Sequence, residues 1–135
     1  MLIVFTDRLS SLPIADTARS ILDGHIQLSR TLAESNHYPA VDVLGSISRV
    51  APAVSPPEQL RAGGAVRELL AAWRDAKDLI EIDAYVAGTN PVVDRAVALK
   101  PRIDAFCRQP VTEVTDLASA REGLAGLVAA PESLP

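Results

Sequence analysis

The sequence is short of cysteine, histidine and aromatic side chains, and each shortage argues against a class of protein. Its one cysteine, Cys107, has no partner in the chain for a disulfide, which fits a reducing cytosol. His25 and His37 are not spaced as H-E-x-x-H and lie far from Cys107, so they offer no zinc ligand set and we predict no metal site. Phe, Trp and Tyr make up 4% of the residues, which favours helical packing over an aromatic-rich β-sandwich.

Long apolar runs and basic runs are also missing. The apolar run at residues 2–5 is far shorter than a signal h-region or the roughly 20 residues of a membrane helix. The 13 Lys and Arg residues are scattered among 17 Asp and Glu residues, and the net charge is −4. A groove for nucleic-acid phosphates is therefore not expected. We predict a cytoplasmic protein with no membrane span and no nucleic-acid partner.

A phosphate-binding loop is the third absence. None of the seven glycines precedes a lysine, and neither G-x-x-x-x-G-K-[ST] nor G-x-G-x-x-G occurs. The backbone amides of such a loop cradle nucleotide phosphates, so we do not expect this chain to hydrolyse ATP alone. Asp7 follows an apolar run, as a magnesium-holding aspartate can, but without the partner loop we interpret it as structural.

What is present in the first 54 residues is an alternation of strand and helix signals. Residues 2–5 are typical of a buried strand, and a helix is predicted over 14–22 between Pro13 and Asp23-Gly24. A second strand is predicted at 25–28, and Ser29 can cap a short helix after it. Residues 43–50 suit either a strand or a turn of helix, because prolines and a glycine interrupt the region.

From residue 55 onward the apolar spacing is helical. Ser55 and Glu58 have capping-box spacing, so a long helix should begin there, with Trp73 on its buried face. Asn90-Pro91 should start a second helix that ends near Gln109, and a third is expected from Leu117 onward. The chain is thus predicted to be mostly α, with strands confined to its N-terminal third.

Three longer stretches carry a resemblance that the periodicity alone does not give. They are PIADTARSILDGHIQLSR at 13–30, HYPAVDVLGSISRV at 37–50 and DLIEIDAYVAGTNP at 78–91. Together they resemble the C-terminal part of the flagellar and type III secretion export ATPases, relatives of the rotary ATP synthase β subunit. The resemblance covers residues 11–109, in order and nearly without gaps.

The resemblance implies a fold and two site residues. Residues 1–54 would be an α/β remnant of a P-loop nucleotide-binding domain, and residues 55–135 its helical C-terminal domain. Tyr38 stands where the family places a ring against adenine, and Arg49 where it places the arginine finger that reaches the γ-phosphate of a neighbouring subunit. Without the resemblance, Tyr38 would be a packing residue and Arg49 one of eleven arginines.

The implied protein is one part of a flagellar export ATPase that shares ATP sites in a hexamer, with itself or with full-length homologous subunits. ATP would bind at a site that is incomplete in this chain, and Mg²⁺ only through the missing P-loop half. Arg30 and Asp42 also match family positions, where we expect salt-bridge or capping roles. Secretion-apparatus proteins would be the other partners, at the inner membrane.

Departures from the family pattern keep other interpretations open. They are Leu12, Ala51 and the pair Gly63-Gly64, and they suggest a truncated gene product, a split gene or an isolated fragment. The main alternative is a non-enzymatic helical module that docks on the secretion apparatus. A fragment of a virulence-type secretion ATPase and a decayed remnant are the others.

Overall fold

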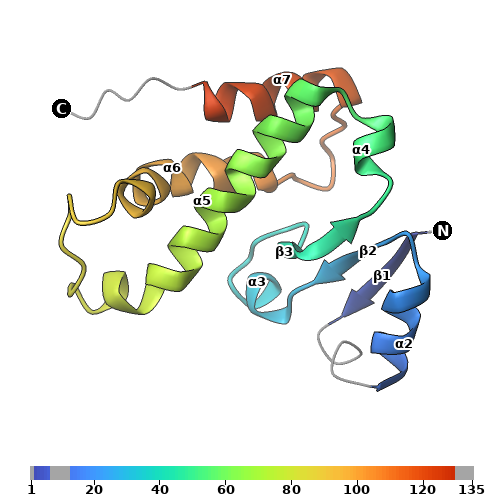
Figure 1. Ribbon diagram of the computed structural model, residues 1–135, viewed down its shortest axis with the longest axis horizontal. Coiled ribbons are helices and arrows are strands. Elements are labelled where there is room, and N and C mark those ends of the chain that lie inside the picture. Colours follow the sequence, from blue (N-terminus) through green and yellow to red (C-terminus); the bar gives the residue numbers. More distant parts are fainter. Residues whose placement is uncertain (1, 7–12, 130–135) are drawn as a thin grey trace. The chain divides into compact units, whose positions relative to one another are not determined.

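The structure is a computed structural model that describes residues 2–6 and 13–129 (Figure 1). Asp7 and Leu12, which the sequence singled out, lie outside the described residues. The chain forms two compact units, each described by itself below. The sheet unit comprises Met1–Pro56 and Cys107–Val111, and the helical unit comprises Pro57–Phe106 and Thr112–Pro135.

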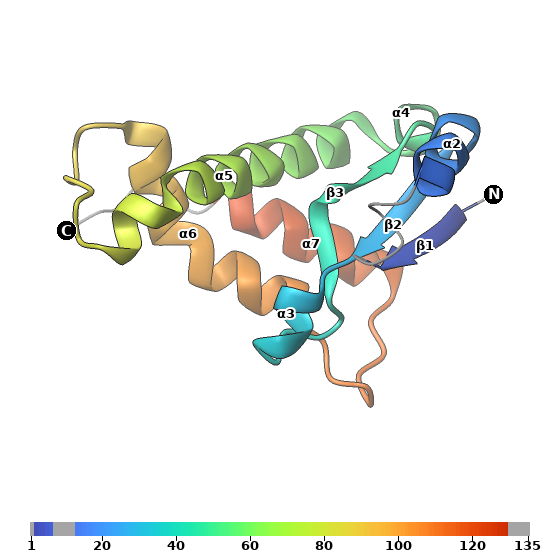
Figure 2. The ribbon, with the colours of Figure 1, turned by 90° about the horizontal axis from the view of Figure 1, so that it is seen from below.

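The sheet unit alternates strands and helices, as the sequence predicts. Its elements are β1 (Leu2–Thr6), α2 (Pro13–Ile21), β2 (Gly24–Leu28), α3 (Arg30–Glu34), β3 (Val41–Ser48) and α4 (Ala51–Val54). β2 lies in the middle of a three-stranded sheet, parallel to β1 and antiparallel to β3 (Figure 2). For residues 43–50 the sequence allowed either a strand or a turn of helix. In the structure they belong mainly to β3, and the short helix α4 follows.

Two local features shape the chain around β2: the cap of the helix that follows it and a glycine at its start. The side-chain oxygen of Ser29 caps α3 by accepting from the amide of Leu32 at 3.4 Å, as its position predicts. At the start of β2, a Cβ on Gly24 would lie 2.8 Å from the carbonyl oxygen of Ile47. Only glycine allows β3 to approach β2 this closely.

The helical unit consists of α5 (Pro57–Glu81), α6 (Pro91–Cys107) and α7 (Leu117–Val128). α5 and α7 pack side by side (Figures 1 and 2). Asp116 begins α7 as its N-cap, since its carboxylate accepts from the amide of Ser119 at 2.7 Å. All three helices contribute side chains to the core: Ala62, Val66, Leu69, Ala76, Val93, Ala96, Ile103 and Leu127.

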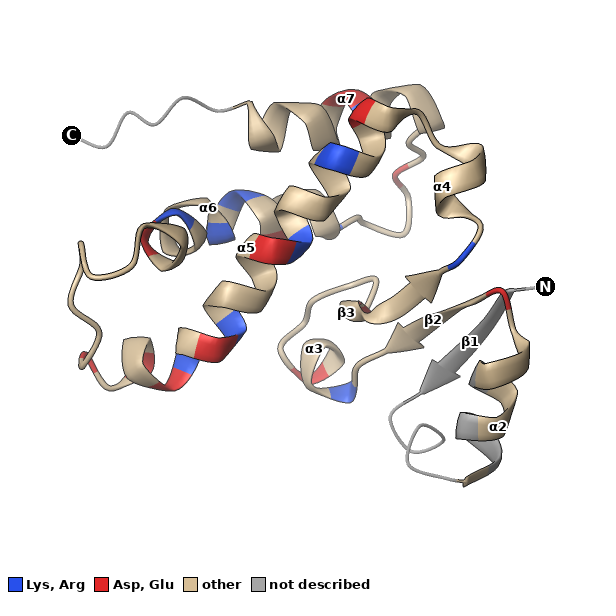
Figure 3. Cartoon of the chain, in the orientation of Figure 1, with Lys and Arg blue, Asp and Glu red and all other residues tan. Residues whose placement is uncertain are grey.

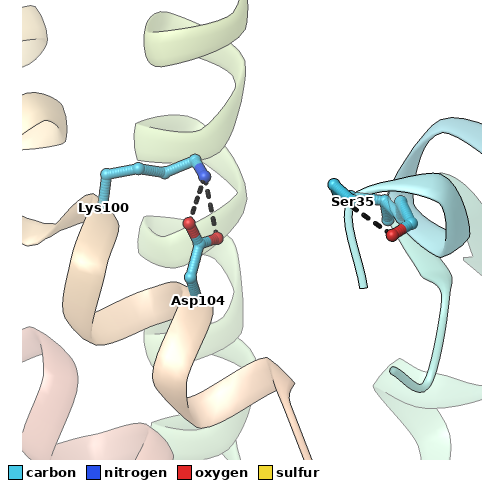
Figure 4. Close-up of polar contacts among 4 residues, drawn as sticks. Ser35, Lys100 and Asp104 are labelled. Carbon is cyan, nitrogen blue, oxygen red and sulfur yellow. Dashed lines mark hydrogen bonds and ion pairs between the residues drawn. The ribbon is translucent and has the colours of Figure 1, made fainter. Parts of the chain in front are cut away.

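Trp73 is half-buried, although the spacing predicted it on the buried face of its helix. The ammonium of Lys100, on α6, lies 4.3 Å from the centroid of the Trp73 ring. The same ammonium pairs with Asp104 at 2.6 Å, one helical turn further along α6 (Figure 4). Trp73 thus joins α5 to α6 through a charged side chain.

Charged residues of both signs are interspersed along α5 (Figure 3). Its exposed ion pairs include Lys77 with Glu81, one turn apart, at 3.4 Å. Within the described residues, no helix is long and apolar enough to cross a membrane.

Candidate functional site

Tyr38 lies in the loop between α3 and β3, on a backbone that is held from two sides. Its carbonyl oxygen accepts from the amide of Gln109 at 2.9 Å. The preceding residue, His37, is buried, and its amide donates to the carbonyl of Leu32 at 2.9 Å. Tyr38 itself is 52% exposed. A fixed backbone with an exposed ring offers a rigid, flat surface on which another flat group can stack.

Arg49 directly follows the last residue of β3. Its amide donates to the carbonyl oxygen of Asp23 at 2.7 Å, so the backbone is tied to the end of the α2–β2 turn. The guanidinium is exposed, and in the part of the chain that the structure describes no side chain pairs with it. An exposed guanidinium is suited to binding an anion that another molecule supplies.

Three exposed apolar residues, Ile47, Val50 and Val54, surround Arg49 in sequence. Val54 is the most exposed of them, at 70%. Arginine flanked by exposed apolar side chains is typical of a surface that another protein covers.

The two predicted site residues lie at opposite ends of β3. Val41 and Ser48, the ends of the strand, face Leu28 and Gly24 on β2. Those partners are four residues apart on β2, which is about 13 Å at the usual rise of a strand. The structure therefore does not bring Tyr38 and Arg49 together in one cluster.

Between these two ends, β3 contains an irregularity that the sequence reasoning missed. Asp42 Oδ1 accepts from the amide of Gly45 at 2.9 Å, and the Ser46 hydroxyl donates to the Asp42 carbonyl at 2.6 Å. Buried His25 places Nε2 3.0 Å from the Gly45 carbonyl oxygen. The one sequence signal for this feature was a glycine inside a strand pattern, which suggests a bulge.

Arg30 and Asp42, which also match family positions, have different roles. Arg30 forms the expected salt bridge, with Glu34 at 2.8 Å, and both side chains are more than 60% exposed, so the pair adds little stability. Asp42 caps a backbone amide, that of Gly45, as described above.

No group of three His, Cys, Asp or Glu side chains that could hold a metal ion occurs within residues 2–6 and 13–129. The two histidines lie in the sheet unit, where both are buried, and His25 contacts a backbone carbonyl. They contribute to the interior of the sheet unit.

Comparison with known proteins defines the class to which the chain belongs. Residues 2–48 match the ATP synthase alpha/beta family, nucleotide-binding domain, and residues 55–126 match the T3SS EscN ATPase C-terminal domain. Tyr38 falls inside the first match, whereas Arg49 lies in the short gap between the two. The chain belongs to the family of the T3SS EscN ATPase C-terminal domain, which covers more than half of it.

Individual relatives agree with this membership. The chain is 48% identical over 117 residues to the flagellum-specific ATP synthase of Pseudomonas aeruginosa, covering 87% of this chain and 26% of that protein. It is 47% identical over 112 residues to the type 3 secretion system ATPase of Pseudomonas syringae pv. tomato, covering 83% and 25%. It thus spans about a quarter of the length of these relatives.

Solved structures show the same likeness. The assembled ATPase EscN from the type III secretion system of enteropathogenic E. coli matches with a TM-score of 0.83 and 39% identity, over 89% of this chain and 29% of EscN. EscN in complex with its central stalk EscO matches with a TM-score of 0.81 and 41% identity, over 87% and 29%. The resemblance inferred from the three sequence stretches is confirmed.

Proposed function

We propose that this chain contributes two residues to ATP sites shared between subunits of a flagellar or type III protein-export ATPase. Tyr38 stacks on the adenine of one nucleotide, and Arg49 reaches the γ-phosphate of a nucleotide bound by a neighbouring subunit. The observation that carries the proposal is the exposure of both side chains, each on a tied backbone, in a chain of this family.

The physical chemistry of the two side chains supports these roles. A guanidinium stays charged and presents forked donors to the charge that spreads over the oxygens of a transferring phosphoryl group. Because Tyr38 and Arg49 lie at opposite ends of β3, the proposal assigns them to two different nucleotides.

The chain supplies only part of such a site. Its sequence contains no glycine-lysine phosphate loop, so the phosphates and Mg²⁺ would be held by a subunit that has one. The two residues that the chain supplies suit the adenine of one nucleotide and the γ-phosphate of another. We propose that the chain acts with itself or homologous subunits in the cytoplasm, at the base of the secretion apparatus on the inner membrane.

The test adds the chain to a homologous export ATPase that has a P-loop but whose own arginine finger is replaced by alanine. We expect the chain to raise ATP turnover at least tenfold, since an arginine finger contributes about 10³-fold or more in related reactions. Arg49→Ala should remove this gain. Arg74→Ala, which deletes an exposed arginine of the helical unit, is the matched control and should keep it.

Two results would contradict the proposal. An equal gain from the Arg49→Ala chain would show that Arg49 is not the finger. Turnover by the purified chain alone, abolished by Arg49→Ala, would show that the chain does not depend on another subunit for its phosphate loop. For Tyr38, we expect Tyr38→Ala to raise the KM for ATP and Tyr38→Phe to preserve it, because stacking requires the ring alone.

A second candidate function, docking without catalysis, is favoured by the loop between α5 and α6. Asp94 holds this loop, because its carboxylate accepts from the Tyr85 hydroxyl at 2.9 Å and from the Gly88 amide at 3.0 Å. The loop region leaves Ile82 and Val86 71% and 66% exposed. A fixed loop that displays apolar side chains is suited to binding another protein.

EscN, a relative, is solved in complex with its central stalk EscO, so a helical stalk protein is the partner we propose for this loop. Asp78, Glu81 and Asp83 are exposed beside the apolar residues, which favours a stalk surface with lysines or arginines. Ile82→Asp should weaken binding of the cognate stalk protein at least tenfold. Leu117→Asp, at an exposed apolar position at the start of α7, should leave it unchanged.

A further inference from the structure

β3 is irregular where it pairs with β2. Gln27 faces Asp42, and His25 faces Ile47, so β2 advances two residues while β3 advances five. β3 therefore holds three extra residues between its two paired segments. Side chains alternate between the faces of a strand, so an odd number of extra residues reverses the face that each later residue presents.

The side chains of Asp42, Ser46 and His25 hold these extra residues around Gly45, and we call the three side chains the Asp42–Ser46 clasp. The Asp42 carboxylate fixes the Gly45 amide, and His25 contacts the Gly45 carbonyl. The Ser46 hydroxyl bridges the two strands, because it donates to the carbonyl of Asp42 on β3 and accepts from the amide of Gln27 on β2 at 3.0 Å.

Gly45 has no room for a side chain within the clasp. A Cβ there would lie 2.8 Å from Asp42 Oδ2 and 3.0 Å from the side-chain amide of Gln27. The clasp therefore closes tightly around the backbone of the bulge, and the number of residues that it encloses is fixed by these contacts.

Arg49 follows Ser46 by only three residues, so the clasp determines where the arginine leaves the sheet. Past the bulge, Ser48 pairs with Gly24, and the Arg49 amide bonds to Asp23. If β3 slipped by one residue, Arg49 would lose this anchor and the side chains of the preceding residues would exchange faces. A misplacement of about 1 Å at a reacting group can cost on the order of 100-fold in rate.

We propose that Asp42 is a positioning residue for Arg49. By accepting from the Gly45 amide, its carboxylate fixes the three extra residues of β3 and hence the point from which the guanidinium reaches the neighbouring nucleotide. This inference rests on the proposed function of Arg49, and it adds a residue that does not itself touch the nucleotide.

The first test uses the same assembly of the chain with a P-loop-bearing, finger-deficient homologue. Asp42→Ala should lower kcat roughly 10- to 100-fold and leave the KM for ATP unchanged, because the binding groups are elsewhere. Asp42→Asn should restore most of kcat, since its amide oxygen can still accept from Gly45. Thr17→Ala removes a side-chain hydrogen bond of the same unit, from its hydroxyl to the Pro13 carbonyl in α2, and should keep kcat.

The second test uses the chain alone and needs no nucleotide. Hydrogen exchange of the Gly45 and Arg49 amides should both accelerate at least tenfold in Asp42→Ala and return to the wild-type rate in Asp42→Asn. A merely local role for Asp42 would accelerate exchange at Gly45 and leave Arg49 unchanged.

The two tests separate this inference from the function on which it rests. If Arg49→Ala leaves turnover unchanged, the proposed role of Arg49 is wrong. Hydrogen exchange of the Arg49 amide in Asp42→Ala then decides by itself whether Asp42 positions Arg49. If Arg49→Ala removes turnover while Asp42→Ala changes neither kcat nor Arg49 exchange, the positioning role is overturned.

Discussion

The two units of the chain differ in the contacts that their described residues make. Among the residues whose burial is described, the helical unit contains eight of the nine buried apolar residues, and the sheet unit contains one, Leu22. The described residues of the sheet unit include two buried histidines, and they are joined by strand pairing and by side-chain contacts such as the Asp42–Ser46 clasp. Apolar packing is non-directional, whereas hydrogen bonds fix geometry, and the proposed nucleotide contacts both lie in the sheet unit.

The largest effect should come from Ile103, which is 1% exposed and lies in the core of the helical unit. Ile103→Ala should lower the free energy of unfolding by about 2–5 kcal/mol, because the lost methyl groups leave a cavity. Leu22→Ala in the sheet unit and Val97→Ala, which is 39% exposed on the same helix as Ile103, are the comparisons. Urea unfolding measures all three, and an equal loss in Leu22→Ala would remove the contrast between the units.

The second prediction tests how closely α6 and α7 pack. A Cβ on Gly123 would lie 2.9 Å from a ring carbon of Phe106, whereas nothing lies within 4 Å of one on Gly126. Gly123→Ala should therefore destabilise the helical unit by about 1–3 kcal/mol. Gly126→Ala, three residues further along α7, should not. Thermal unfolding of the two variants decides this, and equal midpoints would mean that Phe106 can move aside.

A smaller effect of opposite sign is expected within α5. The sequence indicated that Gly63 and Gly64 weaken this helix, and the structure shows α5 running through both, with nothing within 4 Å of a Cβ at either position. Gly64→Ala should raise the free energy of unfolding by about 0.5–1 kcal/mol, since alanine loses less backbone entropy on folding. A lower unfolding midpoint in urea would show that the glycine has a structural use.

Much of this architecture was predictable because its signals are local. Proline and glycine breakers, the Ser29 cap and the helical apolar spacing placed nearly every element within a few residues. The Asp42–Ser46 clasp was not predictable, since it depends on contacts between β3 and distant residues of β2. The backbone tie from Tyr38 to Gln109 is likewise non-local.

The two site residues show the limit of local reasoning more sharply. Nothing in the spacing distinguishes Arg49 from the other arginines of the chain, and only the family resemblance selected it. The structure adds an exposed guanidinium and a tied backbone, which are features that a sequence pattern cannot express. Packing signals recur in any helix, whereas a site is defined by groups that come together in space.

The smallest effect concerns the pH dependence of the helical unit, through the N-cap of α7. The amide of Ser119, which donates to the carboxylate of Asp116, lowers the pKa of that carboxyl below its usual 3.8. A lowered pKa in the folded state stabilises the fold at pH values above 3.8, and this contribution is lost as the pH falls through the lowered value.

Asp116→Asn retains an acceptor for the Ser119 amide but cannot titrate. The thermal midpoint of the wild-type chain should therefore fall slightly more than that of Asp116→Asn between pH 5 and about pH 3. Parallel curves for the two chains would mean that the exposed cap contributes no pH dependence, and the stability of the helical unit would then rest on its apolar core alone.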